Sequence, residues 1–242
     1  MVRGVLAPTA LLVAVAAVVA ACGGSPSATP RPADRAPAAP RATHAAPSPP
    51  AVAPSDRPVV APAPRLRVSD GRPRVARLGI PALGLHDLQV VPYRGWTDDA
   101  PGTEIQDRGL GASPFGPRGG VGPGGLGNYQ ITGHRTSSTH PFAALPSLAP
   151  GARAVVVVGD VRYVYEIRRT RQTSFRSSRS LAEQRAAVPG RPGAVPTHAY
   201  LTLSTCATQE DHAAGNYWSD ALHNPEHRID KIGVLVRTVV AE

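Results

Sequence analysis

"ARAVVVVGDVRYVYEIRRTRQTSF", residues 152–175, contains two runs of β-branched and aromatic residues separated by Gly159 and Asp160. A Gly-Asp pair between two such runs favours a hairpin with a two-residue loop. The stretch therefore predicts two long antiparallel strands, and it sets the expectation that the fold consists mostly of β-structure.

Shorter strand patterns lie on both sides of this hairpin. They are "RVARLGIPALGL" (74–85), "LQVVPY" (88–93), "NYQITG" (128–133), "AYLTLSTC" (199–206) and "RIDKIGVLVRTVV" (228–240). In residues 199–206, Leu201 and Leu203 alternate with Tyr200, Thr202 and Ser204, which predicts a half-buried strand. The set predicts a mostly β domain, with a Greek-key-like barrel as its architecture.

Helices are expected to be few and short. "PFAALPSL" (141–148) suggests one, and "SLAEQRAAV" (180–188) begins with a capping box of Ser180 and Glu183. Residues 97–127, rich in Gly and Pro, are expected to form a loop with at most one helical turn. Residues 210–227 are polar and are expected to be irregular.

The first 22 residues have the layout of an export signal. One Arg precedes an apolar run over residues 5–21, and the run ends in "VAAC" at Cys22. This ending resembles the lipobox of bacterial lipoproteins, which implies a lipidated Cys22. An uncleaved anchor helix and free secretion remain alternatives, since 17 apolar residues lie at the short limit for a span. We expect a domain that is attached to the outer face of the cytoplasmic membrane.

Residues 23–72 are predicted to be a disordered linker, and residues 73–242 the globular domain. Twelve of the 27 prolines lie between residues 23 and 66, among Ala, Ser and Arg, so little apolar surface can be buried there. The net charge of +9 divides into +5 for residues 1–72 and +4 for the rest. This distribution fits a basic tether beside anionic lipid or wall polymer. A nucleic-acid partner is excluded, because no basic stripe carries interleaved aromatics.

Three strand ends carry candidate chemistry. His134 follows "NYQITG", Cys206 ends "AYLTLSTC", and Arg228 begins the last strand. A cysteine thiolate can attack an amide carbonyl, a histidine can move the proton, and an arginine can donate to a carbonyl or oxyanion. Cys22, the other cysteine, lies far away in the N-terminal segment, so Cys206 is expected to be unpaired.

"ITGHRTSSTHPF" (131–142), "LTLSTC" (201–206) and "HRIDKIGVLV" (227–236) resemble the sortases, cell-wall transpeptidases of Gram-positive bacteria, and look most like the actinobacterial class E. The resemblance implies a closed sortase-type β-barrel with short helices. It implies that Cys206 attacks the Thr-Gly bond of an LAxTG- or LPxTG-like sorting signal and forms a thioacyl-enzyme. His134 would protonate the leaving amine and deprotonate the acceptor, while Arg228 would hold the substrate or the oxyanion.

The same resemblance implies further partners and residues. A peptidoglycan cross-bridge amine would be the acceptor, and neither a cofactor nor a metal is expected. Thr205 would shape the oxyanion pocket. Apart from the resemblance, Trp218 and Tyr217 in the loop after Cys206 leave two alternatives open: stacking on the substrate, or pinning the loop to the barrel.

The 21 residues between Cys206 and Arg228 form a longer loop than the resemblance predicts. Arg237 is therefore the alternative arginine, although it lies farther along the strand. The loop also contains His212, His223 and His227, but no ligand pair has a familiar metal spacing, so a solvated lid is preferred.

Two other functions remain open. One is a Cys/His peptidase of another class, such as an L,D-transpeptidase or a papain-like enzyme. Both fit poorly, because His134 precedes Cys206 and Cys206 follows a strand. The other is a non-catalytic sortase-like envelope lipoprotein that binds wall polymer. The joint presence of Cys206, His134 and Arg228 favours the enzyme.

Overall fold

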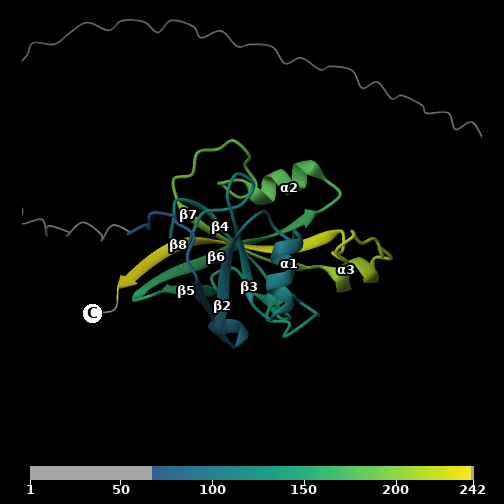
Figure 1. Ribbon diagram of the computed structural model, residues 1–242, viewed down its shortest axis with the longest axis horizontal. Coiled ribbons are helices and arrows are strands. Elements are labelled where there is room, and N and C mark those ends of the chain that lie inside the picture. Colours follow the sequence, from purple (N-terminus) through teal and green to yellow (C-terminus); the bar gives the residue numbers. More distant parts are fainter. Residues whose placement is uncertain (1–66, 241–242) are drawn as a thin grey trace, which may run out of the picture. The chain divides into compact units, whose positions relative to one another are not determined.

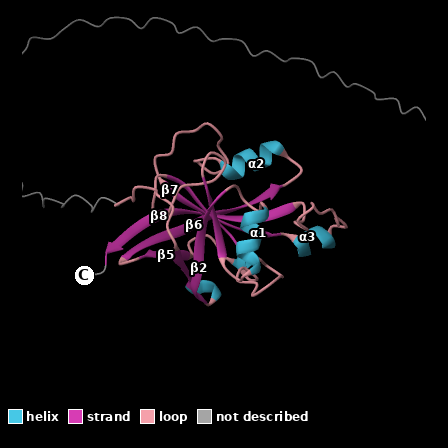
Figure 2. Cartoon of the chain, viewed as in Figure 1, coloured by secondary structure: helices cyan, strands magenta, loops and turns pink. Residues whose placement is uncertain are grey.

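The structure, a computed structural model, describes residues 67–240 of the chain. The expected export signal, the lipidation site at Cys22 and most of the expected linker lie outside the described residues. Eight strands form a closed barrel in the order β1-β2-β3-β4-β7-β8-β6-β5. Figure 2 shows how small the helical share of this part of the chain is. The predicted fold class, a mostly β closed barrel with short helices, is confirmed.

The strands are β1 (Ala76–Ile80), β2 (Leu85–Arg94), β3 (Gly111–Phe115), β4 (Gly127–Thr132), β5 (Arg153–Val158), β6 (Val161–Ser174), β7 (Ala199–Cys206) and β8 (His227–Val240). The α-helices are α1 (Ala100–Asp107), α2 (Ser178–Arg185) and α3 (Thr208–Ala213). Two 3-10 turns occupy Pro81–Leu83 and Leu145–Ser147. Figure 1 shows the three α-helices outside the strands.

The predicted hairpin is present as β5 and β6, which are joined by Gly159 and Asp160. Val158 pairs with Val161, and Gly159 adopts a φ of 57°, which glycine reaches without steric cost. Most neighbouring strands are antiparallel, but β2 pairs with β3 in parallel and so does β4 with β7. The β2–β3 connection contains α1, since parallel neighbours need a crossover. These two parallel pairs distinguish the barrel from an antiparallel Greek key.

Several local predictions were wrong. Residues 97–127 contain the two-turn helix α1 and the strand β3, and residues 210–227 include most of α3. Helix α2 begins before the predicted capping box, because its N-cap is Ser177, which accepts from the backbone N–H of Ser180. "PFAALPSL" forms only the 3-10 turn at Leu145–Ser147.

Strand β7 is buried on both faces, rather than on one as predicted. Leu201 and Leu203 point into the apolar barrel core, where Ile131, Tyr129 and Phe142 also lie. Thr202 and Ser204 on the other face are each 2% exposed. The groups that bury Thr202 and Ser204 are polar. Alternation of apolar and polar residues therefore could not show that this face of β7 is buried.

Gln184 of α2 is the centre of this polar cover. It accepts a hydrogen bond from Thr97 (2.9 Å) and donates to Ser204 (3.3 Å) and to Asp230 Oδ1 (3.0 Å). Asp230 also accepts from Thr173 (2.6 Å) and Ser204 (2.7 Å), which satisfies a carboxyl group whose pKa is raised by burial. Helix α2 is thereby attached to the outer face of β6, β7 and β8.

The only lysine of the sequence, Lys231 on β8, is 3% exposed. Its Nζ donates to the Pro146 carbonyl (2.8 Å) and to Thr170 Oγ1 (2.9 Å), and burial lowers its pKa. The ammonium group is therefore held inside the protein by neutral acceptors.

Residues 67–72, which the sequence assigned to the linker, contact the barrel. Thr238 donates to the Arg67 carbonyl (2.7 Å), Ser69 N donates to Gly124 O (2.9 Å), and Gly122 N donates to Gly71 O (2.7 Å). Across residues 67–240, no helix combines the length and apolar character needed to cross a membrane.

Candidate active site

The pairing of β7 with β8 puts Cys206 directly opposite Arg228. Because side chains alternate along a strand, Cys206 lies on the same face as Thr202 and Ser204, away from the core. The Arg228 guanidinium donates through Nη1 to Cys206 Sγ. Cys206 is partly buried and is unpaired among the described residues. The structure thus brings two of the three predicted strand-end residues into contact.

Arg228 is held in place from several sides although it is only 2% exposed. Nη2 donates to Asn224 Oδ1 (2.7 Å) and lies 3.1 Å from Asp98 Oδ1. The guanidinium carbon lies 4.9 Å from the centre of the Phe175 ring. These contacts fix the orientation of the guanidinium beside the thiol.

Burial and two neighbouring charges act on the ionisation of the Cys206 thiol. Burial raises its pKa, and the negative charge of Asp98 adds to the rise, while the positive charge of Arg228 opposes it. Asp98 thus affects the charge at Cys206 although it belongs to the loop between β2 and α1. No sequence motif marks Asp98 as a site residue.

His134 lies beside Cys206 because β4 runs parallel to β7. The register pairs Thr132 with Ser204, and Gly133 N continues the ladder by donating to Ser204 O (3.2 Å). Two residues further, this register brings His134 level with Cys206. All three predicted site residues therefore lie at one end of neighbouring strands.

The His134 ring is oriented by a carboxylate that sequence reasoning missed. Its Nε2 lies 2.8 Å from Oδ1 of Asp107, the last residue of α1. An ionised carboxylate only accepts, so Nε2 carries the proton and Nδ1 remains for proton transfer. "APGTEIQD" (100–107) has no feature that sets Asp107 apart, because the contact is made by tertiary packing.

Thr205, which the resemblance placed at the oxyanion pocket, is 1% exposed. Its hydroxyl donates to the Gly133 carbonyl (2.8 Å), on the opposite face of β7 from Cys206. It ties the end of β7 to the residue that precedes His134.

Arg135 joins the same two strand ends from the other side. It donates to the Cys206 carbonyl (3.3 Å), to Gln209 Oε1 (2.8 Å) and to Glu210 Oε1 (3.0 Å) on α3. Only 7% of its side chain is exposed. Arg135 therefore connects the residue after His134 to the helix after Cys206.

We expect Arg135→Ala to lower the free energy of unfolding by about 1–3 kcal/mol, because its partners lose charge-assisted hydrogen bonds. The matched control is Arg153→Ala on β5, since Arg153 is exposed. Urea unfolding curves measure both. Equal losses for the two variants would contradict the role assigned to Arg135.

The long loop after Cys206 returns the chain to Arg228 through its own hydrogen bonds. Ala207 N donates to His227 O (2.9 Å), and Asp220 accepts from the backbone N–H groups of Leu222 and Asn224. Asn224 then reaches Arg228. Arg237, the alternative arginine, is exposed and pairs with Val164, nine residues further along β8.

The remaining residues of the long loop contact one another or Arg176, which follows β6. The Trp218 ring lies 5.9 Å from the Arg176 guanidinium, and the His212 ring lies 4.8 Å from that of Tyr217. His227 pairs with Asp211 at 2.6 Å. His223 adopts a φ of 60° in the turn that leads to Asn224.

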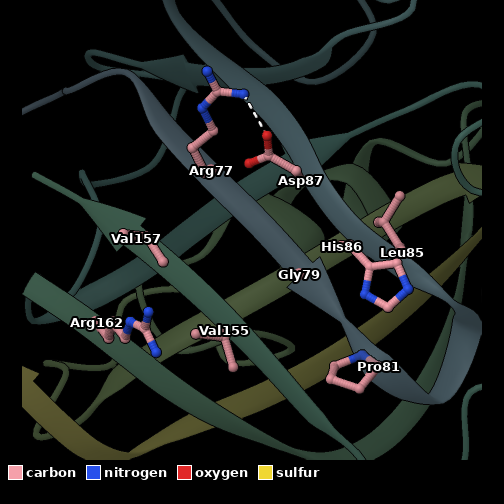
Figure 3. Close-up of a pocket in the computed structure, with 9 residues that line it drawn as sticks. All are labelled: Arg77, Gly79, Pro81, Leu85, His86, Asp87, Val155, Val157 and Arg162. Carbon is pink, nitrogen blue, oxygen red and sulfur yellow. Dashed lines mark hydrogen bonds and ion pairs between the residues drawn. The ribbon is translucent and has the colours of Figure 1, made fainter.

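Two hollows lie in the surface of the described residues. One, of about 310 Å³, is lined by Trp96, Phe115 and Arg118 and adjoins the loop that carries Asp98. Another, of about 380 Å³, lies on the outer face of β1, β2 and β5, where Arg77 and Asp87 form an ion pair at its edge (Figure 3). Cys206, His134 and Arg228 line neither of these two hollows.

A sequence model of the sortase domain matches residues 78–221, more than half of the chain. The chain belongs to the sortase family. The matched range includes His134 and Cys206 and ends within the long loop, before Arg228. The resemblance stated from the sequence is confirmed. No curated protein sequence matches this sortase.

Solved structures of similar fold are also sortases. "SrtA sortase from Actinomyces oris" aligns with a TM-score of 0.53 at 19% identity, covering 74% of this chain and 88% of that one. Sortase E1 from Streptomyces coelicolor, solved with a tripeptide in its active site, gives 0.52 at 21%, covering 72% and 94%. Sortase E from Streptomyces avermitilis gives 0.50 at 23%, covering 70% and 91%. At these identities the likeness concerns the fold.

Proposed function

We propose that this sortase cleaves the Thr-Gly bond of an LAxTG- or LPxTG-like sorting signal and transfers the acyl group to a cell-wall amine. The observation that carries the proposal is the contact of Arg228 with Cys206, beside the strand end that carries His134, within a sortase domain. A nucleophile, a proton carrier and a cationic donor at one barrel end are the groups that acyl transfer requires.

In the first half-reaction, His134 takes the proton of the Cys206 thiol, and the resulting thiolate attacks the threonine carbonyl. Arg228 stabilises the oxyanion that forms, either by donating to it directly or by holding the substrate backbone. The C–N bond to glycine breaks, and His134 gives its proton to the leaving amine. A thioester between Thr and Cys206 remains.

In the second half-reaction, the acceptor amine attacks the thioester carbonyl. His134 removes the amine proton, the C–S bond breaks, and Cys206 leaves as a thiolate. The Asp107 carboxylate, bonded to Nε2, stabilises the imidazolium that is present until the leaving amine is protonated and that forms again when the acceptor amine loses its proton. Thr205 and Arg135 act by holding the two strand ends in register.

The proposal is tested by incubating the full chain, in detergent, with LAxTG or LPxTG peptides and hydroxylamine. We expect threonine hydroxamate to form, because hydroxylamine captures the thioester. A class E-like preference predicts a faster reaction with LAxTG. If neither peptide gives product and no adduct forms at Cys206, the proposed function is wrong.

We further propose that residues 1–22 export the protein and attach it to the envelope, through lipid on Cys22 or through an uncleaved helix, and that the Pro- and Ala-rich segment spaces the domain from the membrane. The export-signal pattern and the basic charge of residues 1–72 support this arrangement. Intact mass of protein from membrane fractions distinguishes the alternatives, since lipidation adds a diacylglyceryl mass on Cys22 after removal of residues 1–21.

A further inference from the structure

Asp98 occupies an unusual position in the loop between β2 and α1. It is 5% exposed and adopts a φ of 60°, a left-handed backbone conformation that residues other than glycine seldom adopt. Gln106 Nε2 donates to its Oδ1 (3.1 Å), and Asn224 Nδ2 donates to its backbone carbonyl (3.3 Å). Contacts from α1 and from the long loop together hold Asp98 in this conformation.

The Asp98 carboxylate is directed at Arg228. Oδ1 lies 3.1 Å from Nη2, and both side chains are only 2% exposed. Breaking such a buried pair leaves an uncompensated charge, which makes the contact costly to disrupt. The second carboxylate oxygen of Asp98 and Nε of Arg228 are buried without a hydrogen-bond partner. Each member of the pair therefore keeps one buried polar atom that makes no hydrogen bond to the described residues.

The two amino groups of the Arg228 guanidinium have different partners. Nη2 is occupied by Asp98 and Asn224, whereas Nη1 faces Cys206. A guanidinium is a planar fork, so fixing one of its amino groups fixes the direction of the other. A carboxylate that close also offsets the positive charge that Arg228 presents to the thiol.

We propose that Asp98 is a positioning residue that acts through Arg228: it fixes the guanidinium so that Nη1 points at the reacting sulfur, and it offsets the arginine charge in the resting site. The catalytic part of this proposal rests on the proposed transpeptidase function. The part that concerns the thiol does not.

The other charged groups near Cys206 and Arg228 are already paired or hydrogen-bonded. Glu210 of α3 is bound to Arg135, whose guanidinium also contacts the Cys206 carbonyl. His134, after β4, is bound to Asp107. Asp230 on β8 accepts three hydrogen bonds. Asp98 is thus the carboxylate in direct contact with the arginine that contacts the thiol.

The first test is the rate of alkylation of Cys206 by iodoacetamide as a function of pH, read by mass spectrometry on the peptide that carries Cys206. Asp98→Asn keeps the shape and the acceptor Oδ1 but removes the charge. We expect the midpoint of the pH profile to fall by about one unit, since a nearby negative charge disfavours the thiolate. The matched control is Asp99→Asn, because Asp99 instead caps α1 by accepting from Gly102 N (3.1 Å).

The second test separates positioning from a merely structural role. We expect Asp98→Ala to lower kcat by about tenfold or more with little change in KM, because a misdirected guanidinium stabilises the transition state poorly. Asp98→Asn should restore part of the loss. In an Arg228→Gln background, Asp98→Ala should cause no further loss of kcat.

The two tests decide the electrostatic part and the positioning part of the proposal separately. An Asp98→Asn profile with the wild-type midpoint, or one that the Asp99→Asn control reproduces, overturns the electrostatic part. An equal loss of kcat from Asp98→Ala with and without Arg228 overturns the positioning part. If Asp98→Ala does not fold, as thermal melting would show, Asp98→Asn in both backgrounds replaces it. A shifted midpoint in a protein that transfers no peptide would disprove the proposed function and leave the effect of Asp98 on the thiol intact.

Discussion

Replacing Cys206 by alanine is expected to abolish both cleavage and transfer of a sorting-signal peptide. In the proposed reaction, the thioester that links the two half-reactions forms on Cys206 Sγ, and no other described residue supplies a thiol. Alanine fits without strain, because the cysteine side chain is small and only partly buried. Hydroxamate release and the mass of the acyl-enzyme both measure the effect, and both should fall below detection.

Cys22→Ser is the matched control, since it removes the other thiol of the chain. Its peptide transfer in detergent should equal that of the unaltered protein. Residual transfer by Cys206→Ala above a few per cent would mean that another group attacks the peptide. A loss in Cys22→Ser of the same size would show that Cys206 is not the nucleophile that the geometry suggests.

Arg228→Ala is expected to lower kcat/KM by about 10²–10³-fold, because removing one hydrogen-bond donor to a developing oxyanion has an effect of this size. Arg228 contacts Cys206 and is 2% exposed, whereas Arg237 lies exposed on the same strand, opposite Val164. Arg237→Ala is therefore the internal control and should stay within about twofold of the unaltered protein. Peptide cleavage at several substrate concentrations gives both constants.

Stability has to be measured beside activity, because Arg228→Ala leaves Asp98 buried without its partner. We expect it to cost about 3–5 kcal/mol of unfolding free energy. Arg228→Lys keeps the charge but loses the planar fork, so it should be more stable than the alanine variant while remaining strongly impaired. A larger loss of kcat/KM in Arg237→Ala than in Arg228→Ala would contradict the assignment of the arginine.

The sequence predicted the parts of the site that lie on long, regular strands. Alternation over residues 199–206 located β7, and the β-branched and apolar residues of 228–240 located β8; their pairing then set Cys206 opposite Arg228 despite the long loop between them. The Gly159-Asp160 turn likewise fixed the hairpin of β5 and β6. In these elements the local pattern and the tertiary environment favour the same structure.

The parts that were missed depend on tertiary contacts. Residues 111–115, "GASPF", have a Gly and a Pro in five positions, and they form β3 because β2 pairs with them in parallel. Two serines three residues apart, Ser177 and Ser180, compete as the N-cap of α2, and the backbone geometry selects the first. Asp98 and Asp107 reach the site across distances in sequence that no local motif spans, whereas Asn224 contacts Arg228 from four residues away.

The burial of Lys231 has a practical consequence for an enzyme that passes acyl groups to amines. Lys231 is the single lysine in the sequence and is 3% exposed, and its ammonium group donates to Pro146 and Thr170. In a ligation mixture, the catalyst would thus offer no lysine of its own as a competing acceptor. It would stay free of self-modification at lysine while coupling labelled peptides to lysine-bearing targets.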